Sequence, residues 1–185
     1  MIALTGPSAS GKTETAKYLM AHFGLKKVVT CTTRSPRVGE RDDVDYHFLT
    51  REEFREGIAR GEFLEHAEYN GNLYGTKKAD VGPEKVSCIE ANGVKSYRKY
   101  LGSRMFCVYL DADEETRLTR MISLRKDPLA AAQERIIKDR VVYKDDGRDT
   151  KAYADLVVKT DGLSVAQEAE EVYLAYCEWK KRNRE

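Results

Sequence analysis

The sequence predicts an α/β fold in which a parallel sheet lies between layers of helices. Three observations lead to this prediction. An apolar run at residues 1–4 precedes a glycine-rich loop and then a helical pattern. Strand-like and helix-like segments alternate from residue 86 onward, and a β-rich segment at about 33–80 interrupts the alternation. Alternation of this kind is typical of a parallel sheet covered by helices.

The glycine-rich loop reads GPSASGKT and matches the pattern GxxxxGK(S/T). Residues 14–23 after it have apolar side chains at helical spacing, so the motif stands between a strand and a helix, where it binds phosphate. Glycines let the backbone wrap a phosphate, and the N–H groups and the positive helix end point at it. Lys12 supplies a charge for the β and γ phosphates, and Thr13 offers a hydroxyl to Mg²⁺. The predicted triphosphate-binding residues are Gly6, Pro7, Ser8, Ala9, Ser10, Gly11, Lys12 and Thr13.

The next elements form the predicted β-rich insert. Residues 27–31 are a second apolar segment, and Pro and Gly in the polar stretch that follows exclude regular structure there. Residues 45–49 are expected to form another strand. Thr50 and Glu53 make a capping-box pattern that opens a helix through residue 60.

A hairpin ends this insert. Residues 63–69 and 72–75 are strand-like, and they are separated by Asn70-Gly71, a dipeptide that favours a tight turn. The strand and helix rhythm then returns. Its expected elements are a strand at 86–89, a helix to about 100, a strand at 105–110, a helix from 113, a strand at 154–158 and a helix capped by Ser164 and Gln167 that ends in the charged residues 180–185.

Composition limits the class of protein. The 185 residues suit one domain with a small insert, and 32 basic against 31 acidic residues give a net charge of +1, which predicts no general attraction to nucleic acid or to an acidic membrane. No apolar run is long enough to span a bilayer and no signal peptide is evident, so we expect a soluble, cytoplasmic protein. The four cysteines lack metal-ligand spacing and are expected to be reduced structural thiols.

Four separated motifs together resemble the guanylate kinase family: GPSASGKT, TTRSPRVGE, DYHFLTREEF and GEFLEHAEYNGNLYGT. The resemblance is close and collinear over about the first 76 residues. It implies a P-loop three-layer fold with a core at 1–32 and 84–185, a nucleoside-monophosphate-binding insert at about 33–80 and a helical lid at about 120–140. It also implies transfer of the γ-phosphoryl group of ATP to GMP or dGMP with Mg²⁺.

The resemblance implies an acceptor site in the insert. Arg34 and Arg37 lie three apart on a constrained loop, and guanidinium forks suit a dianionic phosphate. A carboxylate such as Glu65 accepts from both the N1–H and the amine of guanine, whereas adenine would leave it unpaired. The implied GMP-binding residues are Thr30, Arg34, Arg37, Tyr46, Glu65, Tyr74, Thr76 and Glu90.

The sequence departs from the family pattern after Thr76. Family members carry DxDxxG at the end of the next strand, and here Cys88 and Glu90 stand at the two aspartate positions. A neutral thiol is a poor ligand for Mg²⁺, so the usual metal-side role is expected to be absent, while Glu90 can still accept from guanine. The stretch from Thr76 to Val86 is also shorter than in the family.

The lid is expected to supply cations that stabilise charge in phosphoryl transfer. Arg120 and Arg135 match family arginines, and Arg125 is displaced by one residue; with Lys12 they are the predicted catalytic residues. Arg140 is a further candidate that equally suits a solvated helix face. No general base is required, because the phosphate of GMP is already an anionic nucleophile.

Two alternatives stay open from the sequence. The altered segment at residues 88–93 is compatible with a P-loop kinase for another nucleoside monophosphate or a small phosphorylated acceptor. A binding module that resembles guanylate kinase and lacks catalysis is the second alternative, although the intact phosphate loop argues against it. Both a monomer and a homodimer are compatible with the sequence.

Overall fold

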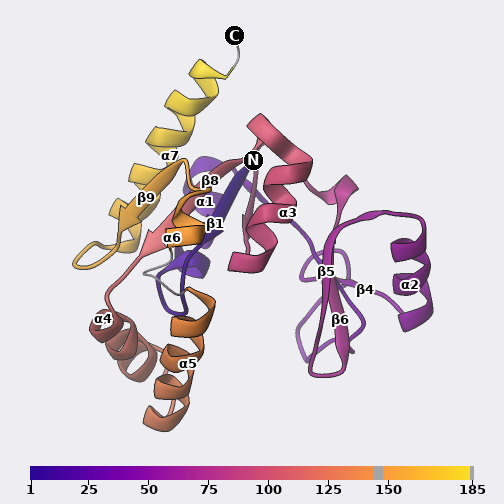
Figure 1. Cartoon of the computed structure of the whole chain (residues 1–185), viewed down its shortest axis with the longest axis horizontal. Coiled ribbons are helices and arrows are strands. Elements are labelled where there is room, and N and C mark those ends of the chain that lie inside the picture. The colour runs from indigo at the N-terminus through magenta and orange to yellow at the C-terminus, as the bar shows by residue number, and fades with distance from the viewer. Residues whose placement is uncertain (144–147, 184–185) are drawn as a thin grey trace.

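Figure 1 shows the computed structural model of the chain, which describes residues 1–143 and 148–183. Residues 144–147 and 184–185, in the predicted core and at its charged end, lie outside the described residues. In the described part the strands form one sheet of five strands and one of four. The smaller sheet lies to one side of the larger one, beside α2 (Arg51–Ala59), as Figure 1 shows.

The larger sheet consists of β1 (Ile2–Thr5), β2 (Lys26–Lys27), β7 (Lys85–Cys88), β8 (Phe106–Asp111) and β9 (Leu156–Lys159). All its strands are parallel, in the order β2-β7-β1-β8-β9. In the centre, Ile2 pairs with Val86 on one side and with Phe106 on the other. β1 and β8 are almost fully buried apolar runs, as a parallel sheet covered on both faces requires.

Helices cover both faces of this sheet. α1 (Lys12–Phe23) and α7 (Val165–Arg182) lie on one face, and α3 (Ala91–Leu101) lies on the other. The short α6 (Arg148–Lys151) precedes β9, while α4 (Glu114–Thr119) and α5 (Leu129–Val142) lie beyond the end of the sheet (Figure 1). Ile2 and Leu4 pack in one core with α1 and α7, whereas Ala3 between them packs in a second core with α3. The predicted three-layer α/β fold is therefore confirmed. None of the helices in residues 1–143 and 148–183 is long and apolar enough to cross a membrane.

The smaller sheet consists of β3 (Cys31–Thr32), β4 (His47–Phe48), β5 (Phe63–Tyr69) and β6 (Asn72–Lys77), in the order β4-β3-β6-β5. Strands β5 and β6 form the predicted hairpin. Asn70 and Gly71 at its turn have φ values of 48° and 72°, the left-handed conformation that these two residue types tolerate best. The capping boxes at the starts of α2 and α7 are also confirmed.

Two segments of the insert region are divided more finely than their patterns indicate. The apolar segment at 27–31 is shared between two sheets, because Lys26–Lys27 pairs with β7 in the larger sheet while Cys31–Thr32 pairs with β6 in the smaller one. An apolar pattern does not show which sheet supplies the partner. The expected strand at 45–49 contributes only His47–Phe48, which pairs with β3 in the smaller sheet.

Candidate active site

The phosphate loop connects β1 to the start of α1. Gly6, Ala9 and Gly11 have φ values of 136°, 60° and 109°, so the loop passes through the left-handed region three times. A side chain at Gly6 would collide with the Leu110 carbonyl, and one at Gly11 would stand 2.7 Å from Glu168 Oε2. The two glycines are therefore required both by the curvature of the loop and by its neighbours.

Lys12 is folded back over this loop. Its Nζ donates to the carbonyl oxygen of Gly6 at 2.5 Å and to that of Pro7 at 2.8 Å. Burial lowers the pKa of the Lys12 ammonium, and the nearby carboxylate of Glu90 acts in the opposite direction. Thr13, one residue later, is exposed on the first turn of α1. An arriving phosphate would meet a partly desolvated cation next to a free hydroxyl.

A cavity of about 700 Å³ lies between the smaller sheet and the carboxyl end of β7. Six of the residues predicted to bind the acceptor line it: Thr30, Tyr46, Glu65, Tyr74, Thr76 and Glu90. Glu65 and Thr76 are paired across β5 and β6, and the Thr76 hydroxyl donates to Glu65 Oε1 at 2.8 Å. Burial raises the pKa of Glu65, partly offset by this hydrogen bond. The cavity therefore has a carboxylate in its wall, held by a fixed donor.

The two arginines of the predicted phosphate clamp differ in their placement. Arg34 donates from both Nη atoms to Glu40, at 2.9 Å each, and its guanidinium lies 5.4 Å from the centre of the Tyr46 ring. This ion pair, with the Arg37 backbone N–H as a second donor, holds the pKa of Glu40 at about 2. The Arg37 side chain is exposed. The structure thus brings Arg34 to the edge of the cavity and leaves Arg37 facing solvent.

Cys88 ends β7, Glu90 follows it, and both line the same cavity. Burial raises the pKa of the Cys88 thiol to about 11, so this side chain is neutral at physiological pH. Cys88 also lines an adjoining cavity of about 410 Å³ with Thr13, Lys17 and Thr30. The acceptor cavity is therefore continuous, through shared wall residues, with the start of α1.

The three lid arginines have different surroundings. Arg120 begins a π-helical turn (Arg120–Leu124) and donates to the Thr160 carbonyl at 2.6 Å, the Thr160 hydroxyl at 3.0 Å and the Ala9 carbonyl at 3.3 Å. Arg125 is near enough to Lys12 to lower its pKa, although less than burial does. Arg135 is half exposed and pairs with Asp127 at 3.6 Å. The structure brings Arg120 and Arg125 towards the phosphate loop and leaves Arg135 paired within the lid.

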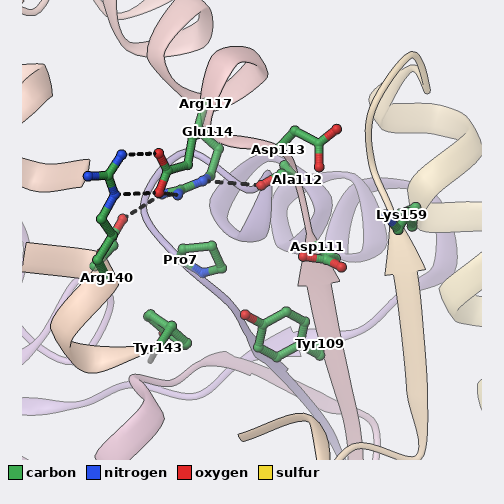
Figure 2. Close-up of a pocket in the computed structure, with 11 residues that line it drawn as sticks. Pro7, Tyr109, Asp111, Ala112, Asp113, Glu114, Arg117, Arg140, Tyr143 and Lys159 are labelled. Carbon is green, nitrogen blue, oxygen red and sulfur yellow. Dashed lines mark hydrogen bonds and ion pairs between the residues drawn. The ribbon is translucent and has the colours of Figure 1, made fainter. Parts of the chain in front are cut away.

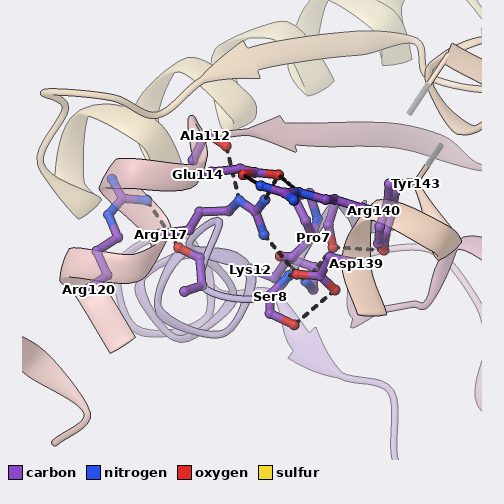
Figure 3. Close-up of polar contacts among 12 residues, drawn as sticks. Pro7, Ser8, Lys12, Ala112, Glu114, Arg117, Arg120, Asp139, Arg140 and Tyr143 are labelled. Carbon is purple, nitrogen blue, oxygen red and sulfur yellow. Dashed lines mark hydrogen bonds and ion pairs between the residues drawn. The ribbon is translucent and has the colours of Figure 1, made fainter. Parts of the chain in front are cut away.

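A buried carboxylate of α5 contacts the phosphate loop, as Figure 3 shows. Asp139 accepts from the Ser8 backbone N–H at 2.9 Å and from the Ser8 hydroxyl at 3.1 Å, and Arg117 of α4 donates to it at 2.7 Å. Tyr143 donates its hydroxyl to the Gly6 carbonyl at 2.8 Å. Helices α4 and α5 are thus fixed to the loop by an Arg117–Asp139–Ser8 latch.

A polar cavity of about 410 Å³ opens beside this latch, at the carboxyl end of β8 (Figure 2). Two of its charged walls are paired: Arg140 binds both carboxylate oxygens of Glu114, at 2.8 and 2.6 Å, and Asp111 pairs with Lys151, outside the lining, at 3.0 Å. Arg140, the further candidate among the lid arginines, is therefore paired with Glu114 on the surface of α4.

Sequence reasoning missed four buried polar residues around the site: Tyr97, Arg117, Asp139 and Glu168. Glu168 of α7 accepts from the Thr15 hydroxyl at 3.0 Å and lies 3.6 Å from Arg120. A signal for Tyr97 and Asp139 is present in the sequence, because each stands at helical spacing among apolar residues, and a polar group on a buried face needs a partner. The identity of that partner is set by tertiary packing.

Two comparisons with known proteins give the same family, and a comparison with solved structures gives the same fold. A family model described as guanylate kinase matches residues 1–173. A guanylate kinase of Chlorobaculum tepidum is 34% identical over 170 residues, which cover 88% of this chain and 85% of that protein. One of Clostridium perfringens is 40% identical over 129 residues, covering 66% of this chain and 60% of its own length. The crystal structure of guanylate kinase from Anaplasma phagocytophilum has the same fold, with a TM-score of 0.66 and 22% identity over 96% of this chain and 84% of that one.

Proposed function

The chain belongs to the guanylate kinase family, and we propose that it transfers the γ-phosphoryl group of ATP to GMP and dGMP, giving GDP and dGDP. One observation carries the proposal beyond family membership. Six of the eight residues expected to bind the acceptor, spread over residues 30–90, line a single cavity of about 700 Å³. That cavity adjoins the phosphate loop, because it shares Thr30 and Cys88 with the smaller cavity that Thr13 lines.

The donor side of the reaction rests on the phosphate loop. The N–H groups at the start of α1 and the positive end of the helix attract the phosphates of ATP. When ATP binds, the Lys12 ammonium exchanges its two loop carbonyls for phosphate oxygens. A buried cation thereby gains an anionic partner. Arg120 keeps the loop against the end of β9 through Ala9 and Thr160.

The acceptor side orients GMP by both of its ends. Glu65 accepts from the base, and Thr76 and Glu90 complete the wall near it. Tyr46 and Tyr74 offer hydroxyls to the phosphate, with Thr30 beside them. Arg34 would exchange the Glu40 carboxylate for the phosphate of GMP, and Arg37 would turn in from solvent. Catalysis then follows from alignment and from cations, because the acceptor phosphate needs no base.

The residues present fit Mg²⁺ as a partner of ATP. Mg²⁺ keeps several waters and is held by substrate phosphates with one or two protein ligands, so a closed protein cage is unnecessary. Accordingly, no group of three or more His, Cys, Asp or Glu side chains suited to a metal occurs among the described residues. Thr13 would hold the ion by its exposed hydroxyl. When bound, Mg²⁺ neutralises charge on the β and γ phosphates.

An ADP-release assay across GMP, dGMP, AMP, UMP and CMP tests the proposed function. We expect turnover with GMP and dGMP, and a loss of about a hundredfold to a thousandfold in kcat for Lys12→Ala, because one preorganised cation is removed. Lys26→Ala, an exposed lysine on β2, is the matched control and should leave kcat unchanged. Equal rates for the Lys12→Ala variant and the unaltered protein would refute the proposal.

A further inference from the structure

A buried tyrosine stands behind the base-binding wall of the acceptor cavity. Tyr97 of α3 is 1% exposed, and its hydroxyl lies 2.9 Å from Thr76 Oγ1. Thr76 is also 1% exposed, and its Oγ1 lies 2.8 Å from Glu65 Oε1. Three polar groups from three elements, α3, β6 and β5, therefore form one continuous hydrogen-bonded chain that ends at the carboxylate of the cavity.

The groups at both ends of this chain set the direction of its protons, the carboxylate as acceptor and the phenol as donor. An ionised carboxylate can only accept, so the Thr76 hydroxyl must donate to Glu65. The hydroxyl of Thr76 has one proton, and so it must accept from the Tyr97 phenol. Hydrogen bonds aligned in this way polarise and strengthen one another.

The anchor of the chain is rigid. The Tyr97 ring packs in the core between the larger sheet and α3, with Val94 and Leu101 of the same helix. Glu65 and Thr76, by contrast, belong to the hairpin of the smaller sheet, where they are register partners. The bond from Tyr97 to Thr76 therefore joins the core to the wall of the acceptor cavity.

We propose that Tyr97 is a positioning residue that fixes base specificity, by holding the Thr76 proton on Glu65 so that this wall offers only acceptors to the base. The proposal rests on the proposed function. Guanine presents an N1–H and an adjacent amine, both donors, and the acceptor-only wall matches them. Adenine presents an acceptor at N1, which would face acceptors and stay unpaired.

The test replaces the phenol and keeps the ring. In Tyr97→Phe the Thr76 hydroxyl is free to rotate, so we expect the KM for GMP to rise about fivefold to tenfold, while kcat and the KM for ATP stay within about twofold. The ratio of kcat/KM for GMP to that for AMP should fall, because the Thr76 proton can turn towards the N1 atom of adenine. Tyr100→Phe on the same helix is the control, since the Tyr100 ring lies against Lys78 and Arg104 outside the cavity.

If Tyr97→Phe lowers the stability of the protein, a double-mutant cycle still tests the proposal. Thr76→Val removes the middle of the chain, and adding Tyr97→Phe to it should then change the KM for GMP no further. Additive effects, an unchanged KM for GMP in Tyr97→Phe, or an equal loss for ATP and GMP would overturn the role of Tyr97. Failure of the unaltered protein to phosphorylate GMP would instead refute the proposed function.

Discussion

Glu65 shows how one buried carboxylate can combine affinity with pH dependence. Burial raises its pKa above the ordinary value, so the charged form that guanine needs is lost at a higher pH than for an exposed glutamate. We expect kcat/KM for GMP to fall as the pH drops through this raised pKa. Because the pKa of Glu65 is raised in the folded state, its protonation stabilises the folded protein. The fall in kcat/KM at low pH therefore does not come from unfolding caused by protonation of Glu65.

Glu65→Gln separates this effect from a general acid sensitivity of the enzyme. Glutamine keeps the size and one acceptor but turns a donor towards the donors of guanine, so kcat/KM for GMP should fall about a hundredfold. Its acid limb should also move to lower pH. The measurement is a pH profile of kcat/KM for both proteins, with thermal unfolding at each pH to confirm that they are folded. An identical acid limb would exclude Glu65 as its source.

Helices α4 and α5 are joined by one buried ion pair and one exposed ion pair. Arg117 and Asp139 join α4 to α5 with side-chain exposures of 6% and 12%, whereas Glu114 and Arg140 join them with 43% and 63%. Removing one partner of a buried pair leaves a buried charge, so Asp139→Asn should lower the free energy of unfolding by about 3 kcal/mol. Arg140→Ala should lower it by less than about 1 kcal/mol.

Chemical denaturation of the two variants checks this difference. Because Asp139 also accepts from Ser8, its replacement should in addition raise the KM for ATP, an effect that Arg140→Ala should not have. Similar losses of stability in the two variants would show that the latch is no stronger than a surface pair.

The elements differ in how far the sequence specifies them. The hairpin, the capping boxes and the buried strands follow from local chemistry, since Asn70-Gly71, Thr50 with Glu53 and apolar runs act within a few residues. The π-helical turn at Arg120–Leu124 does not, because no local sequence signal marks it. The partners of Tyr97 and Asp139 lie 21 and 131 residues away and depend on packing.

At the scale of the whole molecule, the proposed function puts the ATP site at the phosphate loop and the GMP site in the cavity between the two sheets, so ligand binding should report on each separately. A ligand at a hundred times its Kd stabilises the folded state by about 2.7 kcal/mol, which raises the Tm by about 5–10 °C for a chain of this size. ATP and GMP should each give such a shift, and CMP should give none.

Variants on each side then show whether the sites are distinct. Lys12→Ala should abolish the Tm shift with ATP and keep that with GMP, because the Lys12 ammonium donates to the phosphate loop. Glu65→Gln should abolish the Tm shift with GMP and keep that with ATP. Thermal unfolding of both variants with each nucleotide gives a two-by-two comparison. Loss of both shifts in either variant would mean that the two sheets do not bind independently, and the phosphate loop and the hairpin would then have to be ordered together before either nucleotide binds.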